Sequence, residues 1–284
     1  MKKIIFFILS AFFLSLPVFA ADTMPGTVQD IPTQELEGFN LSGYSEGGRK
    51  SWDIKGDKAN VTGDQVAVTN VNANSYGDQD MNMQAKKGNI DKSTGNVNLE
   101  DHVVITSESG ATLKTNTLEW QRGKDLVRTN DKVSIEDKNM TVEGRGLEAH
   151  PNRKDATLKS DVTANVLSDA NDKTKDNRIQ ITSDGPMEVD QASKSAVFNN
   201  NVQAVEFSSG RRLKADRMQV IFDEDSKKIK EIVCTGNVEV HQGKNITYAD
   251  NLLYKADEQR MVLTGKPKLL LDPGDRSSKD ILKY

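Results

Sequence analysis

The fold is decided by two segments, residues 213–220, which read LKADRMQV, and residues 246–253, which read ITYADNLL. Both contain an Ala-Asp pair at a similar position, and in both apolar residues alternate with polar ones. A period of two places one set of side chains on one face of a β-strand. Similar segments at distant positions indicate a repeat architecture. We therefore predict an all-β protein.

Five earlier segments resemble these two, which gives seven units in total. Corresponding positions in the units are residues 57, 86, 116, 145, 184, 216 and 250, at separations of 29, 30, 29, 39, 32 and 34. Each unit has a second half, in which a polar turn precedes another alternating segment, such as GNVNL at 95–99. A unit this short cannot bury its own apolar face, so the units must stack. The sequence predicts an open β-jellyroll or elongated folded sheet built from about seven two-strand repeats, or roughly 14 strands.

The N-terminal segment differs from the repeats. It has a basic start, an apolar run and small residues at its end, which is typical of a cleaved signal peptide. The run is shorter than the roughly 20 residues of a membrane-spanning helix. An uncleaved inner-membrane anchor is the alternative. The predicted segments are a signal peptide (1–21), a linker (22–37), a first β module (38–168), a second linker (169–178), a second β module (179–272) and a polar tail (273–284).

Composition excludes several classes of function. The formal net charge is -4, without the basic patch that nucleic acid requires, so we expect no nucleic-acid partner. The low mean hydropathy of -0.60 suits a thin sheet with one apolar face. Cys234 is the single cysteine, so no internal disulfide forms, and we expect a small buried side chain.

No group of residues has the spacing of a catalytic or metal site. The three histidines lie in different units, and no nucleophile motif or phosphate-binding glycine loop occurs. For Asp216 and Asp250, which recur in the Ala-Asp element, we expect local backbone bonding at strand ends. The sequence therefore predicts neither an enzyme nor a cofactor.

The alternation defines a set of inward-facing side chains, mostly aliphatic residues of medium size. We predict that these residues line the interior and bind lipid: Val97, Leu99, Leu118, Trp120, Val133, Ile135, Val142, Leu147, Met187, Val189, Val202, Leu213, Met218, Val220, Phe222, Val238, Val240, Tyr248 and Leu252.

Three interpretations of this apolar stripe remain open at this point. Two walls that do not close would leave a groove for acyl chains, and each buried methylene contributes about 0.8 kcal/mol. Alternatively, the stripe fills its own core, as in a structural β-solenoid scaffold or adhesin without a lipid ligand. A polysaccharide-acting β-helix enzyme would need charged residues that converge on one face, and the aligned units show none.

The ends of the predicted sheet, near 39–44 and 268–271, have no segment that would form a capping helix. Unpaired edge strands are templates for pairing with another chain. End-to-end assembly through these edges is therefore a natural hypothesis.

Several segments resemble known families. Residues 38–44 (GFNLSGY), 83–88 (MQAKKG) and 142–147 (VEGRGL) resemble the LptC family of lipopolysaccharide-export proteins. Residues 234–238 (CTGNV) and 247–252 (TYADNL) resemble the LptA/OstA N-terminal family. The chain departs from both patterns because it carries the two types in succession.

The resemblance implies an open β-jellyroll in the periplasm of a Gram-negative envelope. Such a protein pairs edge to edge with other β-jellyroll export proteins. It passes lipopolysaccharide from an inner-membrane ABC-type extractor toward the outer membrane, with the acyl chains in a groove lined by the inward set. The LptC type usually keeps a membrane anchor, so we expect tethering here only if the N-terminal segment is not cleaved.

Overall fold

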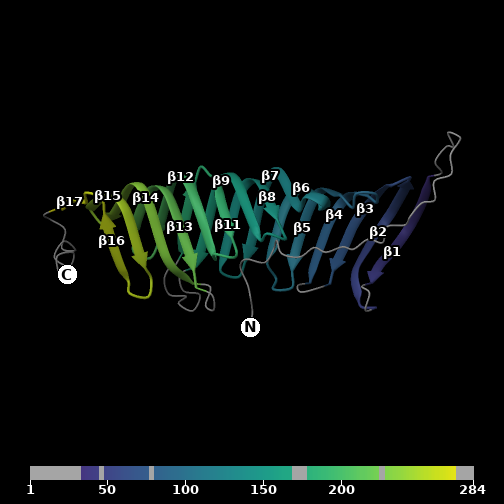
Figure 1. Cartoon of the computed structure of the whole chain (residues 1–284), viewed down its shortest axis with the longest axis horizontal. Coiled ribbons are helices and arrows are strands. Elements are labelled where there is room, and N and C mark those ends of the chain that lie inside the picture. The colour runs from purple at the N-terminus through teal and green to yellow at the C-terminus, as the bar shows by residue number, and fades with distance from the viewer. Residues whose placement is uncertain (1–32, 45–47, 77–79, 168–177, 224–227, 273–284) are drawn as a thin grey trace. The chain divides into compact units, whose positions relative to one another are not determined.

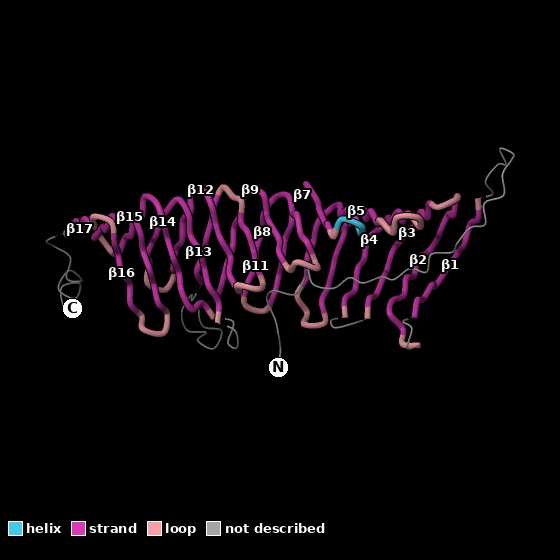
Figure 2. Tube along the Cα trace, viewed as in Figure 1, coloured by secondary structure: helices cyan, strands magenta, loops and turns pink. Residues whose placement is uncertain are grey.

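The computed structural model describes residues 33–44, 48–76, 80–167, 178–223 and 228–272. These residues are almost entirely β-strand, with one short 3-10 helix, η1 (Arg122–Lys124) (Figures 1 and 2). The strands are β1 (Gln34–Tyr44), β2 (Lys50–Thr62), β3 (Gln65–Ser75), β4 (Met81–Asp91), β5 (Val97–Ser107), β6 (Thr112–Gln121), β7 (Leu126–Asp137), β8 (Met140–His150), β9 (Asp155–Leu167), β10 (Arg178–Ser183), β11 (Met187–Asp190), β12 (Ser195–Glu206), β13 (Arg211–Phe222), β14 (Ile229–Gln242), β15 (Asn245–Lys255), β16 (Arg260–Thr264) and β17 (Lys268–Leu270).

These strands confirm the predicted all-β, jellyroll-type fold class. β10 and β11 both pair with β9 and with β12, so they are two arms of one interrupted strand. β16 and β17 likewise share β15 as their neighbour. If each interrupted strand is counted once, the described chain consists of β1 followed by seven two-strand units, from β2–β3 to β15 with β16 and β17. The pairings within and between these units are antiparallel wherever their register is known.

The predicted flanking segments meet the structure only in part. The predicted signal peptide and tail, together with most of both linkers, lie outside the described residues. The end of the first predicted linker is wrong, because β1 begins at Gln34 and pairs with β2 from there onward. The polar composition of this segment suggested a linker, but it does not prevent a strand from forming backbone hydrogen bonds with its neighbour. Similarly, Arg178 closes the second predicted linker and already belongs to β10.

Many strands bend near their middle. In β13, Ala215 and Met218 are both buried although they are three residues apart, and Ala249 and Leu252 repeat this spacing in β15. Between them, β14 carries Gly236 with φ +77°, and its register with both neighbours shifts there. An insertion of this kind is a β-bulge, which bends a strand and increases its twist. Each of these strands therefore consists of two arms, and the alternation of inward and outward side chains holds within each arm.

The aspartates of the Ala-Asp element lie at these bends, so their predicted location at strand ends is wrong. The Asp216 carboxylate accepts a hydrogen bond of 2.8 Å from the side-chain amide of Asn237 on β14. The backbone N–H of Asp250 donates to the carbonyl of Gly265 at 3.2 Å. A bulge interrupts the regular ladder, and polar groups left there need other partners. The recurring aspartate meets that need in the middle of the strand.

The described chain divides into two compact parts, each with its own apolar core. They are larger than the two-strand repeats and are called unit 1 and unit 2 below. Unit 1 comprises Met1–Ile135 and Gly146–Lys154, and unit 2 comprises Glu136–Arg145 and Asp155–Tyr284. Leu113 in unit 1 and Met218 in unit 2 are almost completely buried. Cys234 is also buried, as predicted. The division between the units does not coincide with the predicted second linker.

One carboxylate of unit 1 is buried, with only 2% of Asp53 exposed. It accepts hydrogen bonds of 2.8 Å from the Asn74 amide and the Tyr76 hydroxyl, and it forms an ion pair with Lys50. Burial by itself would raise the pKa of Asp53, but the hydrogen bonds from Lys50, Asn74 and Tyr76 outweigh it and lower the pKa to about 2. The charged carboxylate therefore joins β2, β3 and the residue after β3.

Candidate functional site

Most of the predicted inward residues are buried. The buried ones are Leu99, Leu118, Trp120, Val133, Val142, Leu147, Met187, Val202, Met218, Val220, Phe222, Val238, Val240 and Leu252. The half-buried ones are Val97, Ile135, Val189 and Leu213. The alternation therefore identified inward positions in both the N-terminal and the C-terminal part of the described chain.

Tyr248 differs from this set and requires a correction. Its side chain is 38% exposed, and it lies opposite Glu239 in the β14–β15 register. Its neighbour Ala249 is buried and lies opposite the buried Val238. Tyr248 thus occupies the outer face of β15. Alternation separates the two faces of a strand but does not say which of them is inward. In the register with β14, the inward face of this part of β15 carries Thr247 and Ala249.

Unit 1 contains an apolar cavity of about 50 Å³. Its lining residues are Ile54, Val68, Val71, Ala73, Met83, Gly88, Ile90, Gly95, Val97, Leu99, Trp120 and Arg122. Ala73 and Val68 come from opposite sides of a bend in β3, at Asn70 with φ +52°. Two arms of the same strand therefore face the same space.

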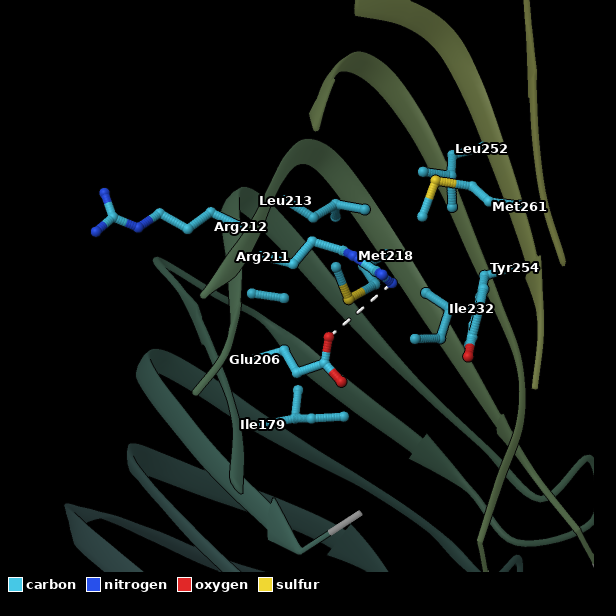
Figure 3. A pocket seen from close by; sticks show the side chains of 11 residues that line it. Ile179, Glu206, Arg211, Arg212, Leu213, Met218, Ile232, Leu252, Tyr254 and Met261 are labelled. Atoms are coloured by element: carbon cyan, nitrogen blue, oxygen red, sulfur yellow. Dashed lines mark ion pairs between the residues drawn. The ribbon is translucent and has the colours of Figure 1, made fainter. Parts of the chain in front are cut away.

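Unit 2 contains a second cavity, of about 100 Å³, shown in Figure 3. Its lining residues are Ile179, Ala204, Glu206, Arg211, Arg212, Leu213, Met218, Ile232, Leu252, Tyr254 and Met261. Leu213 and Met218 lie on opposite sides of the bend in β13 and both contribute to the wall. The same arrangement, with two strand arms around an apolar space, therefore occurs in both units.

The inward set predicted from the sequence includes only some of the residues that line the two cavities. It included Val97, Leu99 and Trp120 in the first cavity, and Leu213, Met218 and Leu252 in the second. It missed Ile54 and Met83, although each is the first residue of a repeated element and corresponds to predicted inward residues in other repeats. It also missed the cationic residues, because they interrupt the apolar alternation that was used as the signal.

Other predicted residues do not line these two cavities. Val133, Val202 and Val238 are at most 1% exposed, so protein atoms surround them closely. At these positions the stripe is filled by the protein's own side chains. The two cavities described above therefore occupy only part of the predicted inward stripe.

Each cavity has arginine at its boundary. In unit 2, Figure 3 shows Arg211 turned toward Glu206, with an ion pair of 3.9 Å between Nη1 and Oε2, whereas Arg212 extends away from the other side chains. The Nε of Arg211 is buried without a hydrogen-bond partner. In unit 1, burial lowers the pKa of the Arg122 guanidinium. Both cavities therefore combine apolar walls with a partly buried positive group.

Two known protein families match this chain. A family described as lipopolysaccharide-assembly, LptC-related, matches residues 4–167, which is more than half of the 284 residues. The chain belongs to the LptC-related family. A second family, described as LptA/(LptD N-terminal domain) LPS transport protein, matches residues 180–282 of this LptC-related chain. A search of curated proteins finds no match.

The two matches confirm the resemblance of the N-terminal part to LptC and of the C-terminal part to LptA. The LptC and LptA families consist of periplasmic bridge proteins for lipopolysaccharide transport and are not known as enzymes. Within the described part of this LptC-related chain, no helix has the length and apolar character needed to cross a bilayer.

Proposed function

We propose that this chain carries lipopolysaccharide across the periplasm by holding its acyl chains between the two arms of its bent strands. The observation that carries the proposal is the pair of apolar cavities, each bounded by both arms of one strand. Lipopolysaccharide transport is the function of both matching families. The groove and its acyl-chain contacts are the finer part of the proposal.

The cavity volumes place a condition on this mechanism. Spaces of about 50 and 100 Å³ hold only a few methylene groups each. A longer chain therefore extends beyond the cavity or separates the arms, and separation exposes apolar side chains that pack against each other in the lipid-free protein. Each methylene that leaves water contributes about 0.8 kcal/mol, which offsets that loss of packing between the arms. The inward residues predicted from the sequence are the surfaces that such a chain would contact.

The exposed apolar residues at the two ends support assembly with other bridge proteins. On β1, Leu41 is 46% exposed, and beyond β15 Leu270 on β17 is 43% exposed. Within the described residues β1 pairs with β2, and its other edge is a template for a strand of another chain. We infer that β-jellyroll export proteins pair at these edges, and that an inner-membrane ABC-type extractor supplies the lipid and the energy.

We further propose two modules, with the predicted bounds 38–168 and 179–272 extended to include the start of β1 at Gln34 and of β10 at Arg178, and with residues 1–21 removed as a signal peptide. The family matches end at residue 167 and begin again at residue 180, on either side of the predicted second linker. N-terminal sequencing of the protein from the periplasm tests cleavage. A mature chain that begins near residue 22 supports a free carrier, whereas an intact N-terminus indicates tethering to the inner membrane.

The competing hypothesis is a structural β-solenoid without lipid, which the filled parts of the stripe would suit. Native mass spectrometry of protein extracted without detergent separates the two. A carrier retains lipid whose mass matches lipopolysaccharide or lipid A fragments, while a scaffold shows only the mass of the polypeptide.

A further inference from the structure

The cavity of unit 1 is bounded by one charged residue among the described side chains that line it, and that residue is Arg122. The backbone of Arg122 is fixed, because its N–H donates to Oδ1 of Asn96 at 3.0 Å and its carbonyl accepts from the N–H of Asp125 at 3.1 Å. Arg122 lies in η1, directly after β6 and two residues beyond Trp120, which also lines the cavity.

The side chain of Arg122 crosses over Gly95. A Cβ atom at Gly95 would lie 3.1 Å from Cδ and 3.5 Å from Nη1 of Arg122. Gly95 has φ +70° and is itself part of the cavity wall. Because Gly95 has no side chain, the side chain of Arg122 has room to reach the cavity.

Two carboxylates can be located relative to Arg122 and both have other partners: Glu119 precedes it by three residues, and the backbone of Asp91 donates to that of Asn96. Glu119 pairs with Nε of Arg128 at 2.7 Å. Asp91 accepts hydrogen bonds from the backbone of Ser93 and Thr94. No ion pair joins Arg122 to a carboxylate of the described residues, and desolvation is the cause that lowers its pKa. A positive charge that is partly removed from water without a counter-charge is costly, and an anion from outside would relieve that cost.

We propose that Arg122 and the cavity of unit 1 form a subsite for an acylated lipid that carries a phosphate group. The acyl chain occupies the apolar space beside Val97 and Trp120, and the guanidinium binds the phosphate. The planar guanidinium suits this role because it donates two parallel hydrogen bonds to one phosphate. This subsite rests on the proposed lipid-carrying function and adds a residue that selects for the anionic group.

Unit 2 provides a contrast that supports the assignment. Of its two lining arginines, Arg211 lies near the Glu206 carboxylate, which supplies a counter-charge within the protein, and Arg212 extends away from the other lining side chains (Figure 3). An external anion would compete with Glu206 there. Arg122 has no such competitor among the described residues, so the first cavity is the better site for a negatively charged lipid.

The test is a titration of the purified mature chain, followed by tryptophan fluorescence in a Trp52→Phe background, in which Trp120 on the cavity wall is the remaining tryptophan. The probes are 1-palmitoylglycerol 3-phosphate, its neutral counterpart 1-palmitoylglycerol, and inorganic phosphate alone, each below the concentration at which micelles form. We expect the phosphate-bearing lipid to bind about 10-fold or more tightly than the neutral lipid, because a hydrogen bond to a charged group has that effect. Inorganic phosphate alone should not bind in the range where the lipid does.

Variants assign this preference to Arg122. Arg122→Gln should bind both lipids with the affinity that the wild type has for the neutral lipid. Arg122→Lys should keep part of the preference, because lysine retains the charge but cannot donate two parallel hydrogen bonds to one phosphate. Arg145→Gln is the matched control, since Arg145 is 62% exposed and lies in unit 2, and this variant should behave as the wild type. If Arg122→Gln does not fold, an Arg122→Lys preference equal to that of the wild type rules out the bidentate contact.

The outcomes separate this subsite from the proposed function. Equal binding of the charged and neutral lipids by the wild type overturns the role of Arg122 but leaves the lipid groove intact. A wild-type protein that binds neither lipid overturns the groove and the subsite together. Binding of inorganic phosphate as tight as that of the lipid shows an anion site without lipid selectivity and also overturns the subsite.

Discussion

Replacement of Ala204 by leucine would fill the cavity of unit 2. Ala204 lines this cavity and lies opposite Leu213 in the β12–β13 register. The three added carbons contribute about 2.4 kcal/mol at about 0.8 kcal/mol each. We therefore expect Ala204→Leu to raise the free energy of unfolding of the lipid-free protein by about 1–2 kcal/mol, since filling is never complete.

Urea unfolding with linear extrapolation measures this change. The control is Ala196→Leu on the same strand, because Ala196 is 4% exposed and does not line this cavity. That variant should be destabilised by about 1–3 kcal/mol through overpacking. The same purified Ala204→Leu protein should retain less lipid than the wild type. Destabilisation of Ala204→Leu to the level of Ala196→Leu refutes the free space, and a stabilised variant with unchanged lipid retention refutes its role in binding.

Two further predictions concern the frame that holds the arms. Asp53→Asn should lower the free energy of unfolding at pH 7 by about 1–3 kcal/mol, because the ion pair and its hydrogen bonds lose the charge. The pKa of Asp53 falls from 3.8 to about 2 on folding, so its contribution to stability is present above pH 4 and is lost as the pH falls toward 2. The acid unfolding curves of the wild type and Asp53→Asn should therefore converge near pH 2. Parallel curves would exclude this role of the carboxylate. Gly236→Ala should destabilise by about 1–3 kcal/mol, since its φ is +77° and a Cβ would overlap the Asp216 carboxylate. Gly210→Ala, with φ +68° but nothing within 4 Å, should cost only about 1–2 kcal/mol, and equal losses in chemical denaturation would show that the Asp216 contact contributes nothing.

The sequence contained enough information for the fold class and the repeat. Alternation such as Met218, Val220 and Phe222 reports directly on the two faces of a strand, and the buried pattern of β13 follows it. The seven units correspond to seven pairs of strands because each unit is one hairpin-like pair. The first residues of β1, 34–37, were predicted as part of a linker, since the edge position of this strand permits polar residues.

The bends and the cavity boundaries were beyond sequence reasoning. A bulge shifts the alternation by one residue, as between Ala249 and Leu252, and this shift is what misplaced Tyr248. Which inward residues enclose free space depends on how two arms approach each other, and alternation carries no information about that distance. Arg122 was missed for a different reason, because a charged residue outside the strands indicates function only once its apolar surroundings are known.

Photo-crosslinking in living cells tests most directly whether acyl chains lie between the arms. A photoreactive amino acid at Val97 or Leu213, both half-buried and lining a cavity, is compared with the same group at the adjacent outward positions Asn98 and Lys214. The account predicts adducts with lipopolysaccharide at Val97 and Leu213 and not at their neighbours. Adducts at Asn98 and Lys214 alone, or none at any position in a folded protein, would contradict it.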